Sequence, residues 1–209
     1  MIASETEKLY PAAKTLVRDK AASRIHAKDH TLYDFEESAC DCAAHFMGWA
    51  DLASNPPFPC EEIQAFADKA IAEGIKTVLL IGQGGSTQAP MTITKYNKID
   101  RNAVDFKVLD SVSPARVRTI LAGTDLSKTL VLVSSKSGGT IEMRSVLDAV
   151  LSYFEECMPA EDVASHLVAI SDPGSNLAKR AQDEGWRACF TVEPTVGGRF
   201  SALSVFGLV

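Results

Sequence analysis

The chain has 209 residues, of which 46% are hydrophobic and 23% are charged, a composition typical of a globular protein with one well-buried core. Its net charge is −6 and it contains no dense cluster of Lys and Arg, so nucleic acid is not expected as a partner. No apolar run approaches the ~20 residues that span a bilayer, and the polar, acidic start is unlike a secretion signal, so we expect a soluble, cytoplasmic protein without a membrane partner.

The N-terminal part of the chain is predicted to be helical. Ser4 and Glu7 have the spacing of a capping box that opens an amphipathic helix, and residues 35–52 show a second helical pattern. The Pro-rich stretch at residues 55–59 then stops the helix and is the best candidate for a domain boundary. The sequence therefore predicts a helical segment over residues 1–59 and a second domain over residues 60–209.

The cysteines do not indicate a metal site. They are odd in number and lack both paired CxxC spacing and nearby histidines arranged as zinc ligands. We expect reduced thiols, mostly buried or incidental, and no bound metal; a metal or redox site at Cys40 and Cys42 is the less favoured alternative.

The second domain begins with a helical pattern over residues 63–71, for which Gly74 is the expected C-terminal cap. Short β-branched runs and helical patterns then alternate. Strands are expected at residues 77–81, 106–109, 129–134, 166–171 and 188–192, and helices at 86–96, 114–121, 140–154 and 175–184. The strands are apolar without alternation, as strands covered on both faces are. The prediction is an α/β fold: a three-layer αβα sandwich with a five-stranded parallel sheet.

Ligands of such sheets bind outside the carboxyl ends of the strands, near a switch in strand order, so the strand-to-helix loops carry the functional argument. The first strand ends in GQGGST at residues 82–87, where glycines let the backbone approach a ligand and Ser86 offers a hydroxyl at a helix start. Because the third glycine of G-x-G-x-x-G is absent, a structural turn and a dinucleotide site both stay open as alternatives here.

The third strand ends in SSKSGGT at residues 134–140, the most informative segment of the chain. Three hydroxyl side chains and a glycine pair precede a strongly amphipathic helix, so hydroxyls, N–H groups and the positive end of the helix dipole converge. The pattern predicts a phosphate site. The alternative, a helix cap, needs only one hydroxyl and does not explain Ser135, Ser137 and Thr140 together.

Two later loops complete the pattern. DPGS at residues 172–175 is typical of a turn followed by a helix cap, and we expect a structural role for it. The stretch VGGRFS at residues 196–201 sets two glycines beside Arg199, which would bring a guanidinium near the crevice. A surface arginine in a flexible loop is an equally good interpretation of that motif alone.

Together these motifs resemble the sugar-isomerase (SIS) domain of the phosphoglucose isomerase family. The matching pieces, in the same order, are IGQGGS (81–86), VSSKSGGTIE (133–142), AISDPGS (169–175) and VGGRFSALSVFGL (196–208). The resemblance covers residues 75–209 and extends only loosely to the N-terminal helices.

The resemblance implies the isomerisation of glucose 6-phosphate to fructose 6-phosphate through a cis-enediolate, without metal or cofactor. It implies a phosphate loop of Ser135, Lys136 (mainly through its backbone), Ser137 and Thr140. It further implies that Gly85 and Ser86 line the sugar, and that Arg199 stabilises the negative charge of the intermediate. Gln83 and Gly139 depart from the family pattern and bear on sugar specificity more than on phosphate binding.

The family's general base, ring-opening histidine and a late lysine lie downstream of the matched region, and no histidine here matches. We therefore expect an incomplete N-terminal part of such an isomerase, truncated on its C-terminal side, and the resemblance also implies a homodimer. Two alternatives stay open. One is a non-catalytic sugar-phosphate-binding or regulatory module; the other is a nucleotide-binding dehydrogenase domain with Asp110 on the ribose, which leaves the SSKSGGT loop unexplained.

Overall fold

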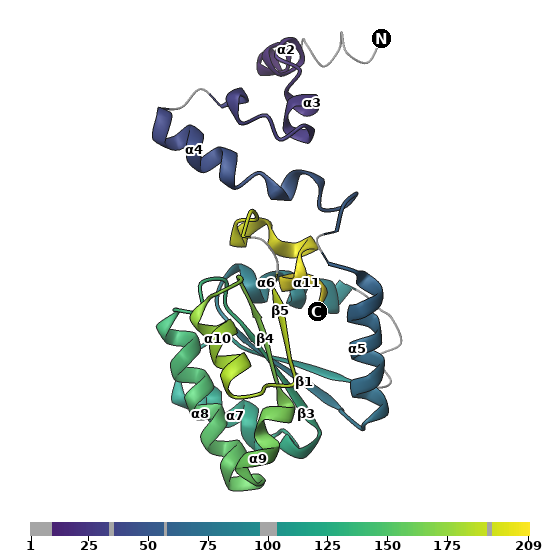
Figure 1. Ribbon diagram of the computed structural model, residues 1–209, viewed down its shortest axis with the longest axis vertical. Helices are drawn as coiled ribbons and strands as arrows, with labels where there is room; N and C mark the ends of the chain where they lie inside the picture. The colour runs from purple at the N-terminus through teal and green to yellow at the C-terminus, as the bar shows by residue number, and fades with distance from the viewer. Residues whose placement is uncertain (1–9, 34–35, 57, 97–103, 192–193) are drawn as a thin grey trace. The chain divides into compact units, whose positions relative to one another are not determined.

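The computed structural model of the chain describes residues 10–33, 36–56, 58–96, 104–191 and 194–209 (Figure 1). It divides into two compact units, Met1–Asn55 and Pro56–Val209, and the boundary in the sequence falls within the Pro-rich stretch. The capping box expected at Ser4 and Glu7 lies outside the described residues.

The N-terminal unit is built from short helices: α2 (Pro11–Arg18), α3 (Ala21–His26) and α4 (Glu37–His45), with the 3-10 turns η1 (His30–Leu32) and η2 (Gly48–Asp51). The helical pattern predicted over residues 35–52 is therefore wrong as one continuous helix. The α-helix ends at His45, and the chain resumes as a 3-10 turn at Gly48, a residue with low helix propensity. The break lets Met47 and Leu52 both be buried.

The second unit contains a parallel sheet of five strands in the order β2-β1-β3-β4-β5. The strands are β1 (Thr77–Gly82), β2 (Asp105–Leu109), β3 (Thr129–Ser134), β4 (Leu167–Ser171) and β5 (Ala188–Thr191). Each lies within about one residue of its predicted position, although His166 belongs to the 3-10 turn η4 (Ala164–His166) and not to a strand, and Val192 lies outside the described residues.

Helices cover both faces of this sheet and form two apolar cores, which confirms the predicted three-layer α/β fold (Figure 1). One core packs the sheet against α7 (Pro114–Ala122), α8 (Ile141–Cys157), α9 (Ala160–Val163) and α10 (Asn176–Asp183). The other packs it against α5 (Cys60–Ala72) and α11 (Val205–Leu208), with α6 (Gly85–Tyr96) beside α11. All six residues of β3 are buried, as its unbroken apolar run predicts.

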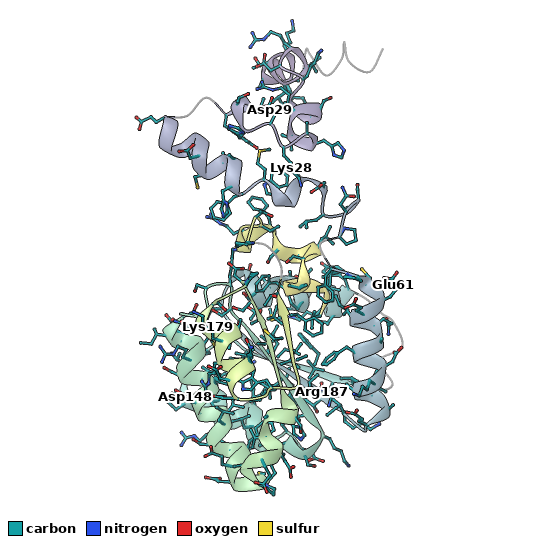
Figure 2. All side chains as sticks on the ribbon, viewed as in Figure 1. Lys28, Asp29, Glu61, Asp148, Lys179 and Arg187 are labelled. Carbon is teal, nitrogen blue, oxygen red and sulfur yellow. The ribbon has the colours of Figure 1, made fainter. Side chains whose placement is uncertain are left out.

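Helix α5 ends as the sequence predicts and is tied to the sheet edge. Gly74 has φ +95°, and the N–H of Ile75 donates to the carbonyl of Ala70 at 3.1 Å, the bonds of a Schellman cap. Beside this cap, Arg187 (Figure 2) pairs with Glu73 through Nη2 and Oε2 at 2.6 Å. The guanidinium also lies 5.5 Å from the ring centre of Phe66, so one side chain joins α5 to the start of β5.

The cysteine expectation is partly wrong. Cys42, Cys60, Cys157 and Cys189 are free thiols, but they are exposed, because they lie at helix ends, on a helix surface or on an edge strand, while aliphatic side chains fill both cores. Among the described residues, no group of three or more His, Cys, Asp or Glu side chains could hold a metal ion. No helix in the described part of the chain combines the length and apolarity that crossing a membrane requires.

Strand order fixes where the loops converge. The chain moves from β1 to β2 on one side and from β3 to β4 and β5 on the other, so β1 and β3 are neighbours at the switch in direction. Their following helices lie on opposite faces of the sheet, so the two loops flank the switch point at which such sheets bind ligands, a position called the crevice below. These are the loops singled out in the sequence.

Candidate functional site

The glycine-rich loop after β1 is packed against the end of β3. Gly82 pairs in register with Ser134, and a Cβ atom added to Gly82 would stand 2.9 Å from the Ser134 carbonyl oxygen and 3.4 Å from Cβ of Ser86. Gly84 has φ +61°, a conformation that favours glycine. The glycines therefore allow Ser86 to sit directly beside the end of the central strand.

The same loop contacts the segment that carries Arg199. A Cβ atom added to Gly85 would overlap the carbonyl of Gly198, lying 2.7 Å from its carbon and 3.4 Å from the backbone nitrogen of Arg199. Arg199 belongs to the 3-10 helix η5 (Gly198–Leu203), and its side chain is exposed. Within the described residues its guanidinium has no hydrogen bond or ion pair. Gly85, Ser86 and Arg199, predicted from separate motifs, thus come together in space.

The 135–140 loop, which precedes α8, gathers its hydroxyls at the start of that helix. The hydroxyls of Ser135 and Thr140 are 3.3 Å apart, and Ser137 Oγ accepts a hydrogen bond from the N–H of Gly139 at 3.2 Å. Thr140 is the N-cap residue of α8, yet its side chain makes no capping hydrogen bond. The helix-cap alternative therefore does not account for the Thr140 hydroxyl, and the first N–H groups of α8 have no side-chain cap.

Lys136 links three loops. Its Nζ lies 2.7 Å from Asp172 Oδ2, in the loop after β4, and donates at 3.3 Å to the carbonyl of Pro194, after β5. Asp172 was expected only in a structural turn, and sequence reasoning missed this ion pair. A signal was available, because Lys136 and Asp172 each stand two residues or fewer beyond the carboxyl end of adjacent parallel strands.

The 171–177 segment is hydrogen-bonded to the 135–140 loop. Ser171 Oγ donates to the carbonyl of Ser135 at 2.7 Å, and the N–H of Asp172 donates to the carbonyl of Lys136 at 3.0 Å. Ser175 caps α10 by accepting from the N–H of Ala178 at 3.0 Å, as the turn-and-cap prediction required. Gly138 has φ +66° and faces the backbone of Leu177, where a Cβ atom would stand 2.6 Å from the nitrogen. The two loops therefore interlock without room for a larger residue at Gly138.

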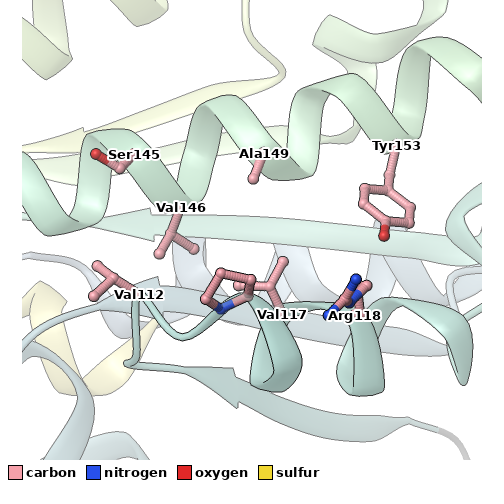
Figure 3. A pocket seen from close by; sticks show the side chains of 8 residues that line it. Val112, Val117, Arg118, Ser145, Val146, Ala149 and Tyr153 are labelled. Carbon is pink, nitrogen blue, oxygen red and sulfur yellow. The ribbon is translucent and has the colours of Figure 1, made fainter.

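A separate hollow of about 270 Å³ lies between α7 and α8 (Figure 3). Its walls are mostly apolar, with Arg118, Ser145 and Tyr153 as polar members; the lining residues are Val112, Pro114, Val117, Arg118, Ser145, Val146, Ala149 and Tyr153. None of the predicted site residues lines it. It is therefore distinct from the crevice between the loops of β1 and β3.

The arrangement of these loops agrees with a family comparison. The model of the phosphoglucose isomerase family matches residues 59–209, which include every motif of the crevice. The chain belongs to the phosphoglucose isomerase family.

Relatives of this phosphoglucose isomerase family member support the assignment. A glucose-6-phosphate isomerase of Trichormus variabilis is 38% identical over 176 residues, which cover 76% of this chain and 33% of that protein. The chain thus spans about a third of the length of the curated relatives it matches.

Two solved structures are similar to this chain in fold. A hypothetical protein from Thermus thermophilus has a TM-score of 0.73 at 29% identity, covering 96% of this chain and 46% of that one. A glucose-6-phosphate isomerase from Chlamydia trachomatis has a TM-score of 0.63 at 24% identity, covering 88% of this chain and 33% of that one, and shows likeness of fold.

Proposed function

We propose that this chain supplies the phosphate-binding part of a glucose-6-phosphate isomerase, which interconverts glucose 6-phosphate and fructose 6-phosphate. The observation that carries the proposal is the convergence of the Ser135 and Thr140 hydroxyls at the uncapped start of α8, in a member of this family. Backbone N–H groups and the helix dipole favour an anion at that point. Ser137, exposed on the same loop, adds a third hydroxyl.

In this proposal the 135–140 loop holds the phosphate while the reacting end of the sugar lies toward Gly85, Ser86 and Arg199. Isomerisation moves a proton between C1 and C2, and the enediolate formed between the two steps carries negative charge on oxygen. An exposed guanidinium without a partner among the described residues is suited to stabilise that charge. Proton transfer beside a carbonyl needs only side chains, so the proposal requires neither metal nor organic cofactor.

The proposal assigns no residue of this chain as the base that moves the proton. We further propose a cytoplasmic location and a homodimer, and a division of labour between an N-terminal helical domain, residues 1–59, and a sugar-isomerase domain, residues 60–209. Turnover by this chain alone would then require a base outside the set of residues assigned above.

The first test is calorimetric titration of the chain with fructose 6-phosphate, with fructose as the control that lacks only the phosphate. We expect binding that depends on the phosphate, and at least a tenfold loss of affinity in the double variant Ser135→Ala/Thr140→Ala, because two hydrogen bonds to a charged group are removed. Unchanged affinity in a folded double variant would exclude the phosphate-loop assignment.

A coupled isomerase assay on the same sample distinguishes a catalytically active isomerase from a chain that only binds the sugar phosphate. Phosphate-dependent binding without turnover is what a phosphate-binding part predicts. Equal binding of fructose and fructose 6-phosphate would contradict both the isomerase and the non-catalytic sugar-phosphate module.

A further inference from the structure

The side chain of Lys136 does not extend freely over the 135–140 loop. Its Nζ is held 2.7 Å from Asp172 Oδ2 and 3.3 Å from the Pro194 carbonyl. The two charged side chains are only 27% and 20% exposed. Ion pairs shielded to this degree are weakened less by solvent and salt than surface pairs, so the contact can hold its geometry.

The Lys136 contact joins the 135–140 loop to two other segments, the one after β4 and the one after β5. The 135–140 loop rests on the 171–177 segment through the Ser171 hydroxyl and the N–H of Asp172. Pro194 stands before the segment that leads to Arg199, and Lys136 contacts both Pro194 and Asp172. Lys136 belongs to the 135–140 loop and contacts Pro194, so its side chain connects that loop to the segment that carries Arg199.

Only one oxygen of the Asp172 carboxylate has a hydrogen-bond donor among the described residues. Its Oδ1 atom is buried and has no hydrogen-bond donor within the described part of the chain, while Oδ2 faces Lys136. A buried carboxylate oxygen without a donor is unfavourable, so stability alone does not explain an aspartate at this place. A site that must fix the spacing between two binding loops gives a reason for retaining it.

We infer that Asp172 is a positioning residue: through Lys136 it sets the spacing between the 135–140 loop and the segment that carries Arg199. The inference rests on the proposed function, since it assigns that spacing to the binding of a sugar phosphate. It also explains why a carboxylate lies close to an anion site, where its charge by itself would oppose binding.

Asp172→Asn distinguishes an effect of charge from an effect of position, because the two predict opposite changes in the affinity for fructose 6-phosphate. Removing a negative charge beside the site should strengthen the binding of an anion if charge alone matters. Loss of the Lys136 contact should weaken fructose 6-phosphate binding by roughly tenfold if position matters. Asp172→Glu keeps the charge but displaces it by one methylene, and should also weaken binding.

Asp110→Asn is the matched control, since Asp110 is an exposed aspartate at the carboxyl end of β2, on the same edge of the sheet. We expect less than a twofold change in affinity for it. Tighter or unchanged binding in both Asp172 variants would overturn the inference while leaving the proposed function intact.

Hydrogen exchange of the unliganded chain gives a readout that does not depend on binding. In Asp172→Asn the amides of residues 136–140 and 195–200 should exchange faster, while the amides of β1 and β3 keep wild-type rates. If the wild-type chain fails to bind fructose 6-phosphate, the proposed function fails. The exchange rates of Asp172→Asn and wild type then still test whether Asp172 positions the two loops. Unchanged exchange in both loops would overturn the inference, and an exchange increase spread over the whole sheet would show a merely structural role.

Discussion

At the scale of single residues, the crevice depends on positions where nothing larger than hydrogen fits. Gly85 brings the loop after β1 against the Gly198 backbone of η5, and Gly138 brings the 135–140 loop against the start of α10. Glycine-rich motifs permit such close approach of two backbones because glycine has no side chain.

Gly85→Ala should therefore separate the loop after β1 from η5. The added Cβ would meet the backbone of Gly198, which cannot move aside as a flexible side chain would. We expect a loss of about 1–3 kcal/mol in the free energy of unfolding, measured with denaturant, together with weaker fructose 6-phosphate binding.

The matched control lies on the other side of the same contact. A Cβ atom added to Gly198 has nothing within 4 Å, so Gly198→Ala should change stability by roughly 0.5 kcal/mol or less. Equal destabilisation by the two variants would show that the contact is looser than the geometry of Gly85 indicates.

At the scale of elements, α5 is attached to the far edge of the sheet by polar as well as apolar contacts. Ile63 and Ala70 of α5 lie in the second core, while Arg187 bridges Glu73 and the ring of Phe66. The Arg187 side chain is 16% exposed, so its ion pair is shielded on one partner only.

Arg187→Met should lower the free energy of unfolding by about 1 kcal/mol, because the ion pair and the cation–π contact are lost while the apolar stem is retained. Chemical denaturation measures this. Lys128→Met is the control: its pair with Asp125 spans 3.8 Å between side chains that are each 57% exposed, and removing it should change stability by less than about 0.5 kcal/mol. A loss no greater than that of the control would mean that α5 is held by its apolar face alone.

At the scale of the whole molecule, the pH dependence of stability follows from carboxylates that accept hydrogen bonds in the folded chain. Hydrogen bonds from Arg24, and then from Thr31, lower the pKa of Asp29 to about 2, and Lys28 and Ser127 lower the pKa of Asp51 and Asp125 respectively. A carboxylate whose pKa is lower when folded stabilises the fold above its unfolded pKa of about 3.9 and loses that contribution as the pH falls through its folded pKa.

The midpoint of thermal unfolding should therefore be constant from pH 7 to about 5 and fall between about pH 4 and pH 2. In Asp29→Asn, the N-terminal unit should show a smaller fall, while the second unit should behave as in the wild type. Hydrogen exchange resolved by residue distinguishes the units. A midpoint that rises on acidification would contradict the assigned direction of these pKa shifts.

Much of the fold could be predicted from the sequence for a physical reason. Strands covered on both faces are continuous apolar runs, and their helices have a 3.6-residue period, so β3 and the α/β class follow from local patterning. Gly74 ends α5 for an equally local reason. The hydroxyl cluster of residues 135–140 could be predicted as well, because Ser135 and Thr140 are only five positions apart in the loop before α8.

Only the tertiary structure determined how separate segments meet. The strand order, with β1 between β2 and β3, brings the glycine-rich loop at Gly82 against Ser134 at the end of β3, and no local pattern encodes which strands become neighbours. The break between α4 and η2 and the exposure of the cysteines likewise depend on what packs against them. The Lys136–Asp172 pair joins residues 36 positions apart, so it exists only once β3 and β4 are side by side.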